Sequence, residues 1–160
     1  MNQQETLMKS LNELVRVCKD TEEELKQAAS KVHDESLQKM LLATARDRAN
    51  WAQEIQAELR DMGVKPVDTG SLSGLLHRMW ANMRYQLNLH NDEVVLRECQ
   101  REEEAALKEY EELVEKRSLK LDSVMERLFV SLIETRDRLQ ERVAAKHHKD
   151  DDSDNHLLHL

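Results

Sequence analysis

The sequence predicts an all-α protein, a four-helix bundle of two antiparallel helical hairpins joined by a long crossover. Among 160 residues, glycine and proline number only four, and all four lie between positions 63 and 74. The turns of β-sandwiches, Rossmann folds and phosphate loops need more of these residues. On both sides of that window, apolar residues recur in steps of three and four, as in helices packed in a bundle. The length fits a single domain with one core.

The first hairpin is predicted over residues 3–32 and 35–62. Asp34 can cap the second of these helices, and Gly63 can end it. The apolar seam of the second helix contains one charged residue, Arg48. A short connection makes the two helices antiparallel. The seam of the first helix alternates in steps of four and three: Leu7, Leu11, Leu14, Cys18, Thr21, Leu25, Ala28 and Val32.

The second half of the chain is predicted to contain a crossover helix over residues 71–88, then helices over 92–117 and 121–147. A single helix from 92 to 147 would be on the order of 80 Å long, which exceeds a compact domain of this size, so a break near Ser118 is expected. Residues 148–160, rich in Asp and His, are expected to be a disordered tail outside the domain of residues 1–147. This order of helices is the ferritin-like topology.

Composition excludes several classes of partner. Acidic residues outnumber basic ones by 32 to 24, giving a net charge of -8, and the basic residues are interleaved with acidic ones rather than clustered. Nucleic acid is therefore not expected as a partner. No apolar run approaches the roughly 20 residues that span a bilayer, and no signal peptide is visible, so a cytoplasmic location is expected. Cys18 and Cys99 fit buried, reduced thiols, although a redox role stays open.

Three segments carry a family resemblance. They are LNEL at 11–14 with CKD at 18–20 and AA at 28–29, SLSGLLHRMW at 71–80, and ECQREEEAALK at 98–108 followed by Tyr110. Over about residues 5–145 the chain resembles an uncharacterised bacterial family of ferritin-like four-helix-bundle proteins. The resemblance implies the fold and assigns no activity; related ferritin-like proteins suggest a stress-related role. The chain departs from the family pattern at Thr21 and Glu24, where small residues are expected, and at Arg136, where histidine is expected. These departures argue against transferring a metal site.

The candidate site is a layer of charged residues at the bundle seam. Di-iron proteins of the ferritin-like fold take one Glu from each of two helices and a Glu-x-x-His pair from each of the other two. Glu22 and Glu103 could supply the first pair, but the chain has no Glu-x-x-His pair. Buried charges need partners. We therefore expect a metal-free polar layer of Glu22, Arg48, Glu103, Arg136 and Arg138. The alternatives are an iron or manganese site with Glu22 and Glu103 as ligands, and carboxylates that reach solvent.

No catalytic or cofactor-binding residues are identified, because the sequence has no nucleophile–base pair, phosphate loop or zinc-binding cysteine pair. The expected function is therefore that of a non-enzymatic, stress-related or structural protein that forms homo-oligomers and needs no cofactor. One alternative is a di-iron or di-manganese metal-binding protein or oxidoreductase. Another is a docking module that binds a protein partner through the crossover helix, with His77 and Trp80 as candidate contacts, or through the C-terminal tip.

Overall fold

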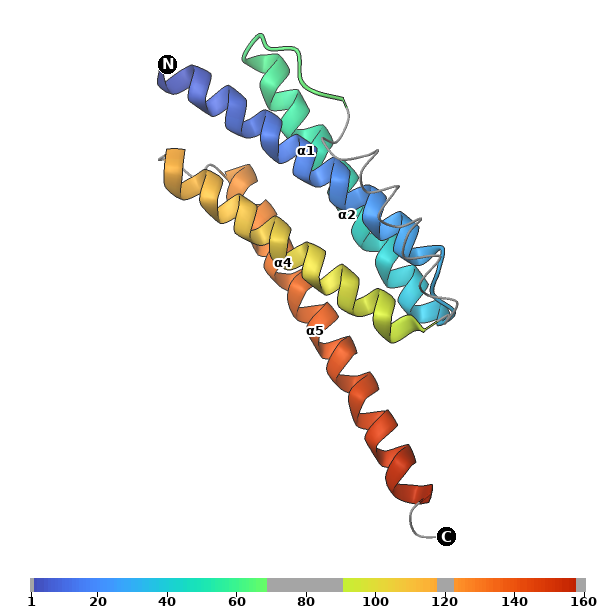
Figure 1. The fold of residues 1–160 in the computed structure, drawn as a ribbon. Coiled ribbons are helices and arrows are strands. Elements are labelled where there is room, and N and C mark those ends of the chain that lie inside the picture. Colours follow the sequence, from blue (N-terminus) through green and yellow to red (C-terminus); the bar gives the residue numbers. More distant parts are fainter. Residues whose placement is uncertain (1, 69–90, 118–122, 158–160) are drawn as a thin grey trace.

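The structure is a computed structural model that describes residues 2–68, 91–117 and 123–157, and these residues form four α-helices and no strand. The helices are α1 (Gln3–Ala29), α2 (Glu35–Asp61), α4 (Asp92–Arg117) and α5 (Ser123–Leu157). Two antiparallel hairpins, α1–α2 and α4–α5, lie against each other (Figure 1). The prediction of an all-α four-helix bundle is confirmed. The predicted crossover helix, with His77 and Trp80, lies outside the described residues.

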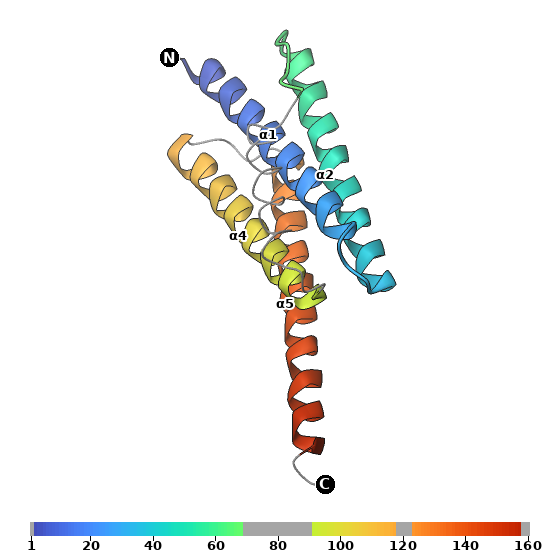
Figure 2. The ribbon, with the colours of Figure 1, turned by 45° about the vertical axis from the view of Figure 1, so that its right-hand side comes forward.

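The two hairpins meet mainly through α1 and α4. The most extensive helix–helix contact lies between α1 and α2, whereas α2 and α5 touch only sparsely (Figures 1 and 2). The buried apolar side chains form two clusters at successive heights along the bundle. The first cluster includes Leu11, Leu14, Ile55, Leu59, Tyr110, Met125 and Leu128. The second includes Leu25, Ala28, Leu37, Leu41, Leu96 and Leu139.

The junction between α1 and α2 also fixes the start of α4. Asp34 caps α2 by accepting a hydrogen bond from the Leu37 amide at 2.9 Å. The carboxylate of Asp92 accepts hydrogen bonds from the backbone amides of His33 and Asp34, at 2.8 and 2.9 Å. These two contacts set the height of the second hairpin against the first. They also explain why α1 ends at Ala29 rather than at the predicted residue 32, since the chain must turn there to present its amides to Asp92.

The end of α2 is held by side chains from both helices of the first hairpin. Gly63 has a φ of +76°, a left-handed conformation that suits glycine at a helix end. Beyond it, the Val67 carbonyl accepts a hydrogen bond from Gln56 at 2.8 Å, and the Val67 amide donates one to the Asn12 side chain at 3.0 Å. Residues 64–68 therefore fold back onto α1 and α2.

The last helix is longer than predicted. It begins at Ser123 and continues to Leu157, so the expected helix end at 147 and the expected disordered tail after it do not hold for residues 148–157. The acidic composition there contains no glycine or proline, and extending an existing helix costs less than starting one. The C-terminal part of α5 projects past the other three described helices (Figures 1 and 2). None of the four described helices combines the length and apolar character that crossing a bilayer requires.

Candidate functional site

A layer of polar side chains separates the two apolar clusters. We call it the polar layer and define it by Glu24 of α1, Arg48 of α2, Glu102 and Glu103 of α4, and Thr135 of α5. Each of the four described helices therefore contributes at least one member. Four of the five residues are buried, and Glu102 is half-buried. Buried polar groups are stable only when they bond to one another, so the contacts within the layer decide its chemistry.

The centre of the polar layer is an ion pair between α2 and α4. Arg48 is fully buried, and its Nη2 lies 2.6 Å from Oε2 of Glu103, which is 1% exposed. Nη2 also donates to the Thr135 hydroxyl at 3.2 Å, and Nη1 donates to the Ser131 hydroxyl at 3.4 Å. Burial raises the pKa of Glu103, whereas the adjacent guanidinium acts to lower it. One guanidinium thus joins α2, α4 and α5.

The hydroxyl groups around the ion pair are oriented by their own helices. Thr135 donates to the carbonyl oxygen of Ser131 one turn earlier, at 2.9 Å, and its oxygen is left to accept from Arg48. Thr21 of α1 and Thr44 of α2 are also buried. Each hydroxyl donates a hydrogen bond to the carbonyl oxygen four residues earlier, at 2.9 Å. In the described part of the chain, Nε of Arg48 has no hydrogen-bond partner.

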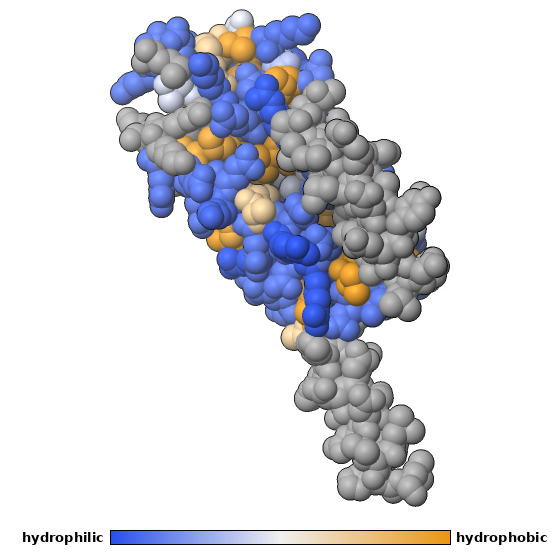
Figure 3. Space-filling model, viewed as in Figure 1, coloured by the Kyte–Doolittle hydropathy of each residue, from blue (hydrophilic) through white to orange (hydrophobic). Residues whose placement is uncertain are grey.

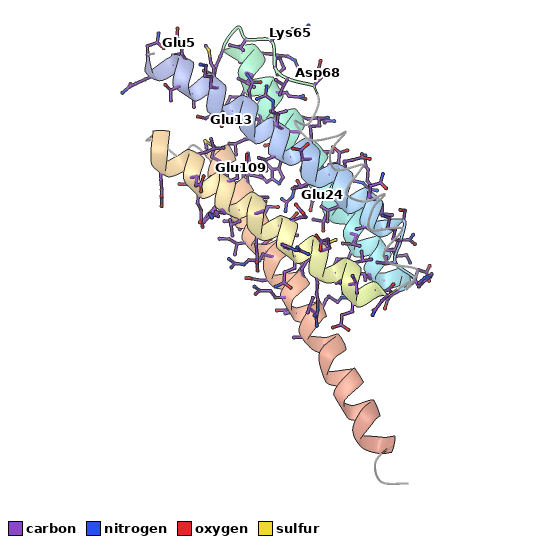
Figure 4. All side chains as sticks on the ribbon, in the orientation of Figure 1. Glu5, Glu13, Glu24, Lys65, Asp68 and Glu109 are labelled. Carbon is purple, nitrogen blue, oxygen red and sulfur yellow. The ribbon has the colours of Figure 1, made fainter. Side chains whose placement is uncertain are left out.

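The polar layer also contains two acids that influence each other electrostatically. Glu24 of α1 is 6% exposed, and Glu102 of α4 is half-buried. Burial raises the pKa of Glu24 to about 9, and the negative charge of Glu102 adds to this shift. The pKa of Glu102 is also raised by burial. Glu24 lies where α1 faces α4 (Figure 4).

The two cysteines flank the polar layer and are both free and buried. Burial raises the pKa of Cys18 to about 12, opposed by Arg48. Burial also raises the pKa of Cys99, and the negative charge of Glu103 adds to the effect. Only a thiolate attacks disulfides or binds metals well, so these thiols are in unreactive surroundings at neutral pH.

Of the five residues expected in one layer, the structure brings together only Arg48 and Glu103. Glu22 instead forms an ion pair with Lys26, one turn later in α1, at 2.7 Å. Arg136 pairs with its neighbour Asp137 at 3.1 Å, and Arg138 reaches Glu134 at 3.8 Å. Including these three in the layer was wrong. The buried positions Leu132, Thr135 and Leu139 define the inner side of α5, which leaves 136 and 138 outside it.

Sequence reasoning missed Glu24, Glu102 and Thr135 as members of the layer. Helix α1 packs on both α2 and α4, so it needs a wider buried face than one seam supplies. A second buried stripe with a spacing of seven runs through Ser10, Val17 and Glu24. That spacing is present in the sequence beside the principal seam of the helix. For Thr135, the available signal is its spacing of three residues from Leu132 and four from Leu139, which are both buried.

The polar layer does not match a di-metal centre. Such a centre needs several carboxylates and imidazoles directed at a shared point, whereas here a guanidinium occupies the middle and takes the Glu103 carboxylate. Among the residues that the structure describes, no group of three or more His, Cys, Asp or Glu is arranged to hold a metal ion. Glu22 and Glu103, the two ligands considered from the sequence, have different partners.

A groove lies on the side where α2 and α5 are least closely packed. It has a volume of about 410 Å³ and is lined by Trp51 of α2 and by residues of α5 between Glu126 and Glu134. Arg127 stacks 5.3 Å above the centre of the Trp51 ring and forms an ion pair with Glu54 at 3.3 Å. Val130, another lining residue, is 52% exposed. The mainly hydrophilic face of the molecule that is drawn in Figure 3 shows scattered hydrophobic patches.

Comparison with known proteins gives one match. Residues 6–116 match the model of a family described as Domain of unknown function (DUF2383). No curated protein matches the chain.

Proposed function

The chain belongs to the DUF2383 family, and we propose that it is a non-enzymatic, ferritin-like helical bundle that acts by associating with copies of itself. The proposal includes a cytoplasmic, stress-related role. One observation carries it: the buried Arg48–Glu103 ion pair takes the place that a metal centre would need. A bundle whose central carboxylate is bound to a guanidinium has no open ligand position for iron or manganese.

Self-association is supported by the surface between α2 and α5. Val130 of α5 is a large apolar side chain that is 52% exposed, and it lines the groove beside Trp51 of α2. Apolar side chains gathered at a groove are typical of protein contact sites. The free, buried thiols of Cys18 and Cys99 are consistent with the cytoplasmic part of the proposal.

The metal-free part of the proposal is tested by mass spectrometric metal analysis. The untagged full-length chain is purified from cells supplemented with iron and manganese, alongside Glu103→Gln. We expect far less than one metal ion per chain in both proteins. Nearly two ions per chain, lost in Glu103→Gln, would instead establish a di-metal protein. Metal retained equally in both proteins would be bound away from the polar layer.

The self-association part is tested by size-exclusion chromatography with light scattering. We expect the wild-type chain to have a mass larger than one chain and Val130→Lys to be monomeric, because the contact would have to bury a charged ammonium group in place of an apolar side chain. Gln140→Lys, an exposed change on the same helix, is the matched control and keeps the wild-type mass. A monomeric wild-type chain at all concentrations contradicts this part of the proposal.

A further inference from the structure

The side of α5 that lines the groove carries opposite charges on either side of an apolar residue. Arg127 lies one turn before Val130, and Glu134 lies one turn after it. Side chains three or four residues apart share one side of a helix, so these three form a stripe. We call it the α5 stripe and define it by Arg127, Val130 and Glu134. The side chains of Arg127 and Glu134 are 56% and 59% exposed, and both can reach a partner outside the chain.

The polar layer fixes the rotation of α5 that leaves this stripe on the outside. Ser131, next to Val130, accepts a hydrogen bond from Arg48 at 3.4 Å, and Thr135 accepts one from the same guanidinium at 3.2 Å. Both hydroxyls therefore face the interior of the bundle. The α5 stripe lies beside them, at the groove where α2 and α5 touch only sparsely.

The charges of the α5 stripe can each take a further ion pair without losing a contact inside the chain. Arg127 stacks 5.3 Å above the centre of the Trp51 ring and lies 3.3 Å from Glu54. A guanidinium has five N–H donors in a planar fork, so it can bond a second carboxylate beside the first. The carboxylate of Glu134 lies 3.8 Å from Arg138, which is longer than a hydrogen bond.

The order of the charges makes the α5 stripe complementary to a second copy of itself that runs in the opposite direction. Positions 127 and 134 are equally far from the midpoint between positions 130 and 131. In two antiparallel α5 helices related by a two-fold axis at that midpoint, Arg127 of each copy faces Glu134 of the other, and the two Val130 side chains meet beside the axis. Glu126, the other acid of the groove, then faces position 135, where Thr135 points inward. Parallel helices would instead place like charges opposite each other.

We propose that the α5 stripe binds the α5 stripe of a second copy of the chain, with the two helices antiparallel and Arg127 of each copy paired with Glu134 of the other. The inference rests on the proposed self-association and adds which residues pair and with what symmetry. A two-fold contact uses the same surface on both copies and is closed, so the assembly contains two chains. Burial of Val130 beside Trp51 favours association, and the charges select the antiparallel orientation.

The test reverses one charge of the α5 stripe at a time in the full-length chain and measures the mass by size-exclusion chromatography with light scattering. We expect two chains for the wild type and one chain for Arg127→Glu and for Glu134→Arg, because each reversal places like charges opposite each other at both ends of the contact. An equimolar mixture of the two variants should recover the two-chain mass, because positions 127 and 134 then carry opposite charges at both ends. Arg101→Glu and Glu111→Arg, exposed changes on α4, are the matched controls and keep the wild-type mass.

The outcomes distinguish this pairing from self-association as such. If the wild type contains two chains and the reversal variants do too, or if their mixture stays monomeric, the pairing is overturned and self-association stands. A wild type that is monomeric at all concentrations overturns both. Recovery of the two-chain mass in the mixture also shows that the single variants are folded, since an unfolded chain presents no stripe.

A cross-linking measurement tests the antiparallel orientation. Under mild oxidation Val130→Cys should form a disulfide between two chains, because position 130 lies beside the axis. In Gln140→Cys the two thiols would be about 28 Å apart along antiparallel helices, so no cross-link is expected. Cys18 and Cys99 are buried, which leaves the introduced thiol as the reactive one. Cross-linking at both positions, or at neither, contradicts the antiparallel pair.

Discussion

Removing one partner of the Arg48–Glu103 pair is expected to destabilise the bundle far more than removing any exposed charge. In Glu103→Ala, the guanidinium would stay buried with only the hydroxyls of Thr135 and Ser131, at 3.2 and 3.4 Å, as partners. Breaking a buried ion pair from one side typically costs about 3–5 kcal/mol in the free energy of unfolding. For a domain of this size that corresponds to a fall in Tm of about 6 to 20 °C.

The double variant Arg48→Met/Glu103→Leu distinguishes two contributions to the free energy of unfolding: the cost of leaving one buried charge unpaired, and the net contribution of the intact ion pair. Replacing both charges with apolar side chains of similar volume removes the need for any partner, and such replacements are often neutral or stabilising by about 1–4 kcal/mol. We therefore expect the double variant to be at least as stable as the wild type, although each single variant is much less stable. The change in the free energy of unfolding of the double variant, minus the sum of the changes of the two single variants, is the coupling energy of a double-mutant cycle.

The assay is urea unfolding followed by circular dichroism, with the exposed pair Arg138 and Glu134 as control. These side chains are 57% and 59% exposed, and their charged atoms lie 3.8 Å apart. Exposed pairs contribute about 0–1 kcal/mol, so Glu134→Ala should change the free energy of unfolding very little. If Glu103→Ala costs no more than Glu134→Ala, the Arg48 guanidinium is hydrated or mobile, and the reasoning from its burial fails.

Three further predictions concern contacts outside the ion pair. Asp92→Ala should lower the free energy of unfolding by about 1–3 kcal/mol in urea titrations, because two amides of the α1–α2 loop lose their acceptor; an unchanged value would show that water replaces the carboxylate. Tyr110→Phe removes the 2.7 Å bond to the Met125 carbonyl oxygen and should cost about 1–2 kcal/mol, with the stacking on the neighbouring ring retained. Cys18 and Cys99 should not react with a thiol reagent at pH 8 until the chain unfolds, because both are buried and burial raises both pKa values; rapid labelling of the folded chain would contradict this.

The helices could be predicted from the sequence because burial in this fold follows the seam spacing closely. The ends of the helices were harder to predict from the sequence. Val32 fits the seam and is 8% exposed, yet it lies beyond the end of α1, because a pattern of apolar residues reports burial and not backbone conformation. The extent of α5 was misjudged for the opposite reason, since a polar segment without glycine or proline can continue a helix that has already formed.

The polar layer could be predicted only where it lies on the principal seam. Arg48 and Glu103 occupy seam positions, so their pairing followed from the need to neutralise buried charge. Glu24 faces α4 from the second buried stripe of α1, and that stripe exists only because α1 has two neighbours. Which helix touches which is a tertiary fact, and the spacing of residues within one helix does not contain it. Arg136 and Arg138 are a different case, because the spacing of Leu132, Thr135 and Leu139 marks the buried side of the last helix and the two arginines lie outside it.

The unequal packing of the four described helices has a consequence for how the chain folds. The contact between α1 and α2 is the most extensive, and it joins segments separated by only five residues, so its loop closes at little entropic cost. We expect this hairpin to form early and the contact of Asp92 with the α1–α2 loop, across 58 and 59 residues, to form late. A substitution in the first hairpin should therefore slow folding, whereas Asp92→Ala should chiefly speed unfolding. The first 61 residues would then serve as the template on which the rest of the protein completes its structure.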